Sequence, residues 1–308
     1  MILVVTGGAG FIGSHVVDAA LARGYEVVVL DDLSSGSPAN VDRRARLVVG
    51  DVSRLQDVMR LAEAARGDEV AIAHLAAVVG VAEAAERPSR AVEVNVLGTA
   101  NVVELARRLD AYVAFASSAA VYGEPERLPV DEGHPLRPAS LYGLTKAQAE
   151  GLLAQAARDY GIRYSALRLF NVYGERMRPG PYASVVYNFI RAALRGERPR
   201  VFGDGRATRD FVYVGDVAEA FLAAVERRAE GPVNVGTGRE TSVLELLELV
   251  GEVTGRRLEP SFEPPRPGDV RRSAADIARA REVLGWSPRV GLREGLRRAA
   301  DYMARLGS

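Results

Sequence analysis

Tyr142 and Lys146 stand four residues apart, and Lys146 is the only lysine of the chain; the other 39 of its 40 basic residues are arginine. A composition that uses arginine everywhere else indicates that position 146 requires an ammonium group, which a planar guanidinium does not replace. On a helix, side chains four residues apart share one face. An ammonium beside a phenol favours the phenolate, so the pair predicts a general base with a lowered pKa at Tyr142. The alternative is an ordinary surface pair one helical turn apart.

A glycine-rich turn, Gly7-Gly-Ala-Gly-Phe-Ile-Gly13, joins a predicted strand at residues 2–5 to a predicted amphipathic helix at 11–23. The spacing fits both common forms of the dinucleotide fingerprint, in a strand–turn–helix context. Glycines let the backbone approach a pyrophosphate, which then lies at the helix N-terminus.

Asp31 ends the next predicted strand, 26–30, and lies eighteen residues after Gly13. A carboxylate there suits the hydroxyls of an adenosine ribose and would repel a 2′-phosphate, so it predicts NAD rather than NADP.

Predicted strands and helices then alternate along the chain. Further strands are expected at 47–50, 70–77, 112–116 and 163–169, with helices at 89–108 and 141–160. This alternation is typical of an α/β protein with a Rossmann-type, doubly wound parallel sheet. Ligands of such sheets bind beyond the carboxyl ends of the strands, where Asp31, Asp51, Ala76, Ser118 and Asn171 fall.

The pattern changes after residue 172, where a polar loop rich in glycine and proline follows. We expect an NAD-binding Rossmann domain at 1–172 and a smaller C-terminal α/β substrate-binding domain at 173–308, whose segments interleave in part. Helices are predicted at 183–195, 214–228, 243–255 and 292–305, and a strand at 200–202.

Composition narrows the class of protein. The 308 residues are 48% hydrophobic, contain no cysteine, and carry 40 acidic and 40 basic side chains. This predicts a soluble globular protein without disulfides or thiolate chemistry, and no general attraction to nucleic acid or to an acidic membrane. No signal peptide or membrane-spanning run is recognised, so we expect a cytoplasmic protein. We also expect no metal site.

Taken together, the glycine turn, residues 74–77, 95–99 and 117–118, Tyr142-x-x-x-Lys146 and Arg168-x-x-Asn171 resemble the extended short-chain dehydrogenase/reductase superfamily. Residues 202–205, 209–214, 234–236 and 266–269 are similar to its nucleotide-sugar branch, above all to the UDP-glucose 4-epimerase (UDP-galactose 4-epimerase) family. In that superfamily, dehydratases and decarboxylases place acidic residues just before Val121-Tyr-Gly, whereas this chain has Ala119 and Ala120. Alanine transfers no proton, so a 4-epimerase is favoured.

The resemblance implies roles for particular residues. The implied catalytic residues are Ser118, Tyr142 and Lys146. The residues implied to bind NAD are Gly7, Gly10, Phe11, Ile12, Gly13, Asp31, Asp32, Ser35, Gly36, Asp51, Val52, Leu75, Ala76, Ala77, Asn95, Ser117, Tyr142 and Lys146. Those implied to bind a UDP-sugar are Ser118, Tyr142, Asn171, Val186, Arg209, Arg266, Asp269 and Ser273.

Several alternatives stay open at this point. A small residue at Ser273 hints that N-acetylhexosamine derivatives are accepted, and Arg176 or Arg178 could bind the carboxylate of UDP-glucuronate. A reductase of a keto sugar and a non-catalytic NAD-sensing regulatory protein are further alternatives. The family dimerises through helices that match 89–108 and 141–160, so a homodimer is expected.

Overall fold

In the computed structural model, the large sheet is formed by short apolar segments whose side chains are nearly all buried. The structure describes residues 1–65, 69–177, 179–180, 182–265 and 270–307. Seven parallel strands pair in the order β3-β2-β1-β4-β5-β6-β11. Their bounds are β1 Ile2–Thr6, β2 Glu26–Asp31, β3 Arg46–Val49, β4 Val70–His74, β5 Tyr112–Ser118, β6 Tyr164–Leu169 and β11 Gly231–Val235.

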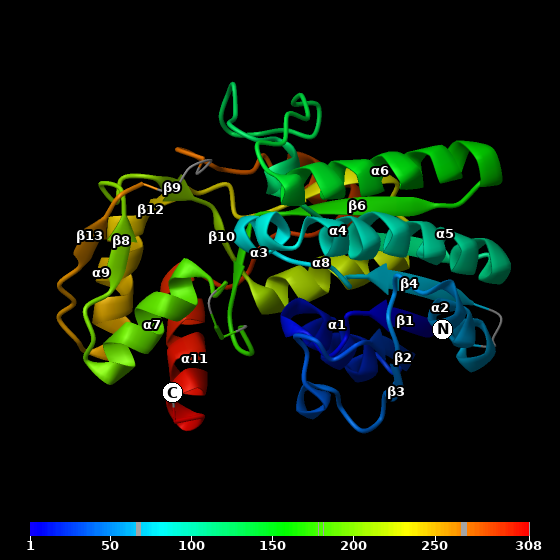
Figure 1. Ribbon diagram of the computed structural model, residues 1–308, viewed down its shortest axis with the longest axis horizontal. Helices are drawn as coiled ribbons and strands as arrows, with labels where there is room; N and C mark the ends of the chain where they lie inside the picture. The colour runs from blue at the N-terminus through cyan, green and yellow to red at the C-terminus, as the bar shows by residue number, and fades with distance from the viewer. Residues whose placement is uncertain (66–68, 178, 181, 266–269, 308) are drawn as a thin grey trace.

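Helices cover both faces of this sheet (Figure 1). α1 (Phe11–Ala22) and α8 (Val214–Arg227) pack together on one face, beside α10 (Ala278–Leu284). On the other face, α5 (Gly98–Leu109) lies between α2 (Leu55–Ala64) and α6 (Leu141–Tyr160). Parallel strands need such crossovers, and two covered faces explain the almost uniformly apolar strands. The doubly wound α/β fold is therefore confirmed.

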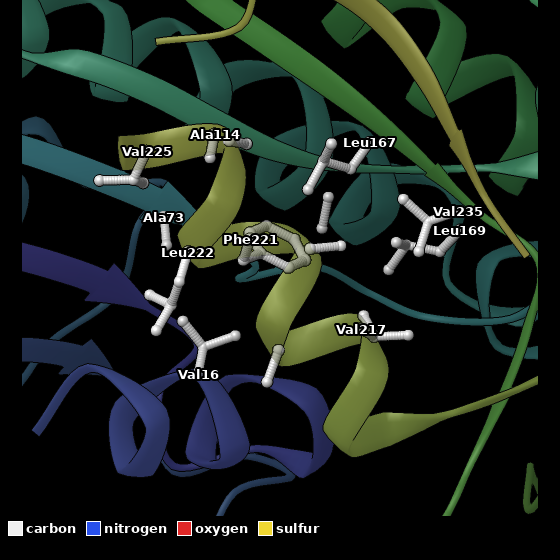
Figure 2. Close-up of a cluster of buried hydrophobic side chains, with 14 of the residues drawn as sticks. Val16, Ala73, Ala114, Leu167, Leu169, Val217, Phe221, Leu222, Val225 and Val235 are labelled. Atoms are coloured by element: carbon white, nitrogen blue, oxygen red, sulfur yellow. The ribbon is translucent and has the colours of Figure 1, made fainter. Parts of the chain in front are cut away.

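Figure 2 shows how α8 is fixed to the sheet. Phe221 and Leu222 point from α8 toward Val16 of α1 and toward small or branched residues of β4, β5 and β6. Phe221 is completely buried, so its removal would leave a large cavity at the centre of this layer.

The predicted helix at 89–108 is present as one unbroken run of helical residues that contains an irregular turn. α4 (Pro88–Val92), a π-helical segment (Glu93–Leu97) and α5 follow one another directly, and the short helix α3 (Val81–Glu86) precedes them. Two side chains explain the irregular turn. Thr99 donates its hydroxyl to the carbonyl of Asn95 at 2.7 Å, and the amide of Asn95 bonds both backbone groups of Val78. Side-chain insertions of this kind distort the helical ladder.

A smaller C-terminal lobe lies beside the large sheet (Figure 1). Its helices α7 (Val185–Arg195), α9 (Val243–Thr254) and α11 (Leu292–Arg305) pack on one another. Around them run three two-stranded ladders: β7 (Asn171–Tyr173) with β10 (Phe211–Tyr213), β8 (Arg200–Phe202) with β13 (Ser261–Glu263), and β9 (Thr208–Arg209) with β12 (Thr241–Ser242). Short 3₁₀ turns occupy Pro38–Asn40 and Ala119–Val121.

The domain boundary at residue 172 remains a prediction. β11 and α8 lie beyond it in sequence, yet they complete the large sheet and one of its covering layers. None of the helices formed by the described residues combines the length and the apolar character that crossing a bilayer would require.

Candidate active site

A cleft of about 500 Å³ opens at the carboxyl ends of the strands of the large sheet. Most of the predicted site residues line it: Gly7, Gly10, Phe11, Ile12, Gly13, Asp31, Asp32, Ser35, Asp51, Val52, Leu75, Ala76, Ala77, Ser117, Ser118, Tyr142, Lys146 and Asn171. They come from segments up to 164 residues apart in sequence, from Gly7 to Asn171. A parallel sheet collects them because all its carboxyl ends face the same way.

The glycine turn is shaped so that side chains cannot replace its hydrogens. Gly7 has a φ of +73°, and a Cβ there would lie 2.7 Å from the backbone nitrogen of Ala76. A Cβ at Gly13 would lie only 2.1 Å from the carbonyl oxygen of Gly7. The N-cap of α1, Gly10, offers no side-chain cap, so N–H groups at this helix end are available to an anion. The turn therefore fits the pyrophosphate of a dinucleotide.

Asp31 is held at the end of β2 by two backbone contacts. Its carboxylate accepts the N–H of Ala9 and that of Leu33, each at 2.9 Å. Burial raises the pKa of Asp31, and these two hydrogen bonds oppose the rise. The carboxylate faces the cleft beside the glycine turn, as a ligand for ribose hydroxyls would.

The three predicted catalytic residues all line the same cleft. Ser118 ends β5, and Tyr142 and Lys146 lie in the first two turns of α6. α6 begins there because Ser140 caps it, accepting the N–H of Gly143 at 3.1 Å. Lys146 is buried and donates from Nζ to the carbonyl of Ala116 at 2.8 Å.

The protonation of this trio differs from the expectation of a phenol acidified by its lysine. Burial raises the pKa of Tyr142, which a hydrogen bond with Ser118 opposes. Burial also lowers the pKa of Lys146 to about 7, despite the nearby carboxylate of Glu150. For both groups burial is the larger cause, because charged forms are poorly solvated in the interior. The predicted lowering of the Tyr142 pKa is therefore not found in this arrangement.

A buried ion pair lies close to Ser117 and Lys146. Arg168 and Glu150 lie 2.7 Å apart, and both are more than nine-tenths buried. Glu150 also accepts the hydroxyl of Ser117, while Arg168 donates to the hydroxyl of Tyr122 at 2.9 Å. The hydroxyl of Ser117 is thus directed to Glu150. The sequence indicated Arg168 only as part of the motif Arg168-x-x-Asn171, and no role was predicted for Glu150.

Other predicted residues do not line the cleft. Asn95 is buried, and its amide bonds Val78 and Thr145, so it positions the cleft wall and does not form its surface. Gly36 packs against Ala9, and Val186 is buried in the core of the C-terminal lobe. Two predicted sugar-nucleotide ligands, Arg209 and Ser273, lie on neighbouring segments of that lobe. Two others, Arg266 and Asp269, lie outside the described residues.

Several residues of the cleft had not been predicted. Arg87, Arg90, Met177, Tyr182 and Ser184 are among its lining residues. The two arginines precede and occupy α4, and the other three belong to the loop leading to α7. With 39 arginines in the chain, nothing in the sequence distinguished Arg87 or Arg90 from surface charges.

Known proteins of one family are similar to this chain in sequence and in fold. Residues 3–236 match the model of the NAD dependent epimerase/dehydratase family. The chain belongs to this family. It is 45% identical over 305 residues to a putative UDP-glucose 4-epimerase of Methanocaldococcus jannaschii, covering 98% of both chains. The structure of UDP-glucose 4-epimerase from Thermotoga maritima with UDP-glucose superposes with a TM-score of 0.95, at 40% identity and with all of both chains covered.

The same family also contains enzymes of different chemistry. UDP-glucuronic acid decarboxylase 6 of Arabidopsis thaliana is 37% identical over 319 residues, covering 100% of this chain and 90% of its own. The higher identity and full-length match to epimerases identify the present chain as an NAD-dependent nucleotide-sugar epimerase. The expectations of an enzyme and of NAD are confirmed, and the alternative of a non-catalytic regulatory protein is not supported.

Proposed function

We propose that this enzyme is a UDP-glucose 4-epimerase that interconverts UDP-glucose and UDP-galactose. The observation that carries the proposal is the residue set at the end of β5 and the start of α6. Ser118, Tyr142 and Lys146 face the cleft together, while the two positions after Ser118 are alanine. This set can move one proton at one hydroxyl group, which is what epimerisation at C4 needs from the protein.

In the proposed mechanism, the glycine turn and Asp31 would hold NAD, which would supply a reversible hydride acceptor for the sugar C4. Tyr142, in its phenolate form, takes the proton of the O4 hydroxyl as a keto group forms at C4, and returns it when the hydroxyl is restored. Ser118, already bonded to Tyr142, holds O4 and can relay that proton. Lys146 places a positive charge near the phenol when it is protonated. C4 would be inverted without net oxidation if the keto sugar turned over in the cleft before it was reduced again.

The relatives with decarboxylase activity define the main competing function. Decarboxylases of this superfamily keep an acidic residue just before the Val-Tyr-Gly segment, where this chain has Ala119 and Ala120. These alanines form the short turn Ala119–Val121 and offer no proton donor or acceptor beyond the backbone. Decarboxylation and dehydration therefore lack their acid–base group here.

A uronate epimerase is less well supported by the structure than by the sequence. It would need a cation for the sugar carboxylate, and Arg176 had been a candidate. Arg176 instead pairs with Asp18 of α1 at 2.7 Å, and it is not among the residues that line the cleft. The other candidate, Arg178, lies outside the described residues.

For the sugar nucleotide, we propose Asn171, Arg209 and Arg266 as ligands of the diphosphate and Asp269 as a ligand of the uridine ribose. Asn171 lies at the cleft, and the chain segment that ends at Ser273 runs beside β9, where the N–H of Thr208 bonds the carbonyl of Arg271 at 2.9 Å. Arginine suits bidentate contacts to phosphate. A small residue at Ser273 supports acceptance of N-acetylhexosamine derivatives.

The test is NMR of the purified protein with UDP-galactose and no added cofactor. Drift to a mixture of the two C4 epimers without accumulating NADH is the expected result. Conversion of UDP-glucuronate but not of UDP-galactose would replace the proposal with a uronate epimerase, and accumulating NADH would overturn it.

We further propose that the enzyme is a homodimer that pairs through α4, α5 and α6. Leu97, Leu144 and Leu152 are apolar residues of this region that are 48%, 42% and 36% exposed. Sedimentation should show a dimer, and Leu152→Arg should weaken it, because an unpaired charge would enter the interface. Phe262→Arg, at a residue 59% exposed on β13, is the matched control. A monomeric wild-type protein would contradict the proposal.

A further inference from the structure

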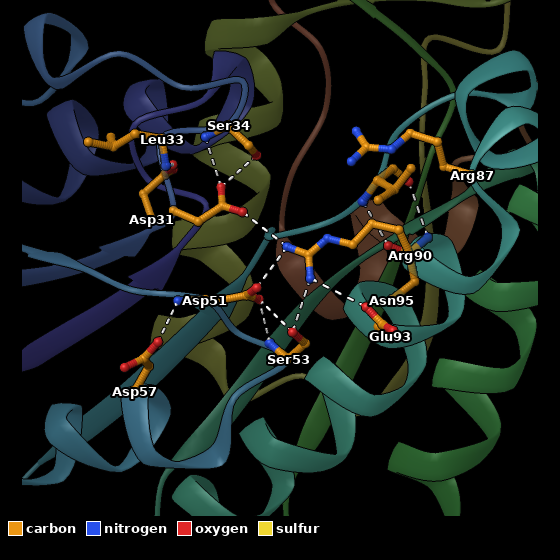
Figure 3. Close-up of polar contacts among 12 residues, drawn as sticks. Asp31, Leu33, Ser34, Asp51, Ser53, Asp57, Arg87, Arg90, Glu93 and Asn95 are labelled. Carbon is orange, nitrogen blue, oxygen red and sulfur yellow. Dashed lines mark hydrogen bonds and ion pairs between the residues drawn. The ribbon is translucent and has the colours of Figure 1, made fainter.

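Arg90 forms a charged cluster at the Asp31 end of the cleft (Figure 3). Its Nη2 lies 2.8 Å from Asp51 and 3.1 Å from Asp32. Its Nη1 donates to the hydroxyl of Ser53 at 3.1 Å and lies 3.7 Å from Glu93. One guanidinium thus contacts three carboxylates and a hydroxyl, which the planar, five-donor shape of arginine permits.

These contacts join three separate parts of the chain. Asp32 lies in the loop after β2, Asp51 and Ser53 lie in the loop after β3, and Arg90 lies in α4. α4 is itself anchored, because Ala91 is completely buried. The guanidinium therefore links two strand-end loops to the helix α4.

The loop after β2 needs such support. Leu33 has a φ of +59°, a region that a branched side chain seldom adopts. Asp32 and Asp31 each accept an N–H from this loop, and Asp32 is in turn held by Arg90. Strained backbone persists only where surrounding contacts determine it.

The charge balance points the same way. Asp31, Asp32 and Asp51 all line the cleft, and Asp51 is only 17% exposed. Without Arg90, three carboxylates would face a cofactor that carries a negatively charged pyrophosphate. Repulsion between these carboxylates and the pyrophosphate would weaken binding of the cofactor, and the repulsion grows as the site is shielded from water.

We propose that Arg90 is a positioning residue that ties the adenosine end of the NAD site together and sets how long the cofactor stays bound. This inference rests on the proposed placement of NAD in the cleft, with its adenosine beside Asp31 and Asp51. It assigns Arg90 no part in proton or hydride transfer. An epimerase regenerates its cofactor in every cycle, so slow release of NAD costs it no turnover.

The experiment compares Arg90→Gln with Arg87→Gln in the full-length enzyme. Arg87 also lines the cleft and carries the same charge, but its ion pair is with Glu83, at 4.0 Å, and its side chain is 60% exposed. Exchange of bound NAD against isotope-labelled NAD, followed by mass spectrometry, gives the dissociation rate. We expect about a tenfold faster release from Arg90→Gln and less than about a twofold change from Arg87→Gln.

Two further readouts separate positioning from a general structural role. Arg90→Gln should lose activity when it is assayed without added NAD and recover most of it when NAD is supplied in excess, because the defect is in retention of the cofactor. Arg90→Lys should still release NAD faster than the wild type, since an ammonium cannot hold both loops as a fork does. Unchanged release from Arg90→Gln, or equal acceleration in both glutamine variants, would overturn the inference.

The proposed function stands or fails separately. If the wild type converts UDP-galactose but Arg90→Gln retains NAD normally, only the inference on Arg90 is wrong. If NAD release accelerates as expected while no UDP-sugar is converted, the tie is supported and the proposed function is wrong.

Discussion

The cofactor side of the cleft and the sugar side are built in different ways. On the cofactor side, most predicted residues lie at the carboxyl ends of strands of one seven-stranded parallel sheet, whose strands are largely buried. The sugar side uses two- and three-residue strands, long loops and residues of the C-terminal lobe. Arg209 and Ser273 lie there, outside the cleft lining.

This difference shows which residues of the site have positions set by the fold before a ligand binds. The glycine turn, Asp31 and Ser118 lie at strand ends of the large sheet, and Tyr142 and Lys146 lie on α6, which packs on that sheet. The sugar-side residues depend on how loops of the C-terminal lobe pack. We therefore expect substitutions on the cofactor side to have large effects and those on the sugar side to change selectivity by smaller amounts.

The largest effect is expected from Tyr142→Phe. Loss of the phenolic oxygen removes the only proposed proton acceptor at O4, so kcat should fall by roughly 10²- to 10⁴-fold. NAD content and the binding of UDP-glucose should stay close to wild type, as measured by mass spectrometry and calorimetry. A variant with full activity would show that another group carries the proton.

The next prediction compares the effect of Lys146 on the free energy of unfolding with its effect on turnover. The pKa of Lys146 is lowered to about 7 in the folded protein, from 10.5. Below pH 7 the folded state must hold a poorly solvated charge, and this cost declines as pH rises from about 7 to about 10.5, where the unfolded chain also loses its proton. Lys146→Met should therefore raise the free energy of unfolding by roughly 2–5 kcal/mol at pH 6.

The measurement is chemical denaturation of both proteins between pH 6 and pH 10. The stability difference should shrink steadily with pH, while the variant loses turnover at every pH. A difference that does not change with pH would mean that Lys146 is not buried as a charge. Lys146→Arg serves as the control for charge and should remain poorly active because a guanidinium is larger and planar.

The third prediction tests the glycine turn. A Cβ at Gly13 would meet the carbonyl oxygen of Gly7 at 2.1 Å, so Gly13→Ala must displace the turn. We expect a loss of about 1–3 kcal/mol in the free energy of unfolding together with loss of copurified NAD. Gly151→Ala is the matched control, because Gly151 lies in α6 with no atom within 4 Å of its added Cβ. That variant should be slightly more stable and should retain NAD.

The sequence predicted the sheet, and the gathering of most proposed cofactor residues at one cleft, because both depend on local patterns. Apolar strands alternate with amphipathic helices, and most of the motifs lie where a strand ends. α6 was predicted at its observed bounds, Leu141–Tyr160. The boundary that sequence placed at residue 172 describes the chain order and not the sheet, since β11 joins β6 from far downstream. Strand pairing at that distance leaves no local signal.

Other features depended on burial or on long-range contacts and could not be predicted. The π-helical turn at Glu93–Leu97, inside the helix expected at 89–108, depends on the contact of Asn95 with Val78. The pKa of Tyr142 is raised because burial outweighs its hydrogen bond with Ser118. The role proposed for Arg90 could not be recognised because it depends on contacts with Asp32 and Asp51, which are 58 and 39 residues away in sequence.

The smallest effect is expected on the sugar side, from Ser273→Tyr. Ser273 is 9% exposed, between Arg272, which pairs with Glu240, and the buried Ala274. A bulky ring there should narrow the space for an N-acetyl group and lower kcat/KM for UDP-N-acetylgalactosamine by about tenfold or more. Turnover of UDP-galactose should change by less than about threefold, and Ser273→Ala should leave both substrates unaffected. Equal losses for both substrates would indicate that the residue supports the lobe and does not select the sugar, and the sugar side would then resemble the cofactor side in its rigidity.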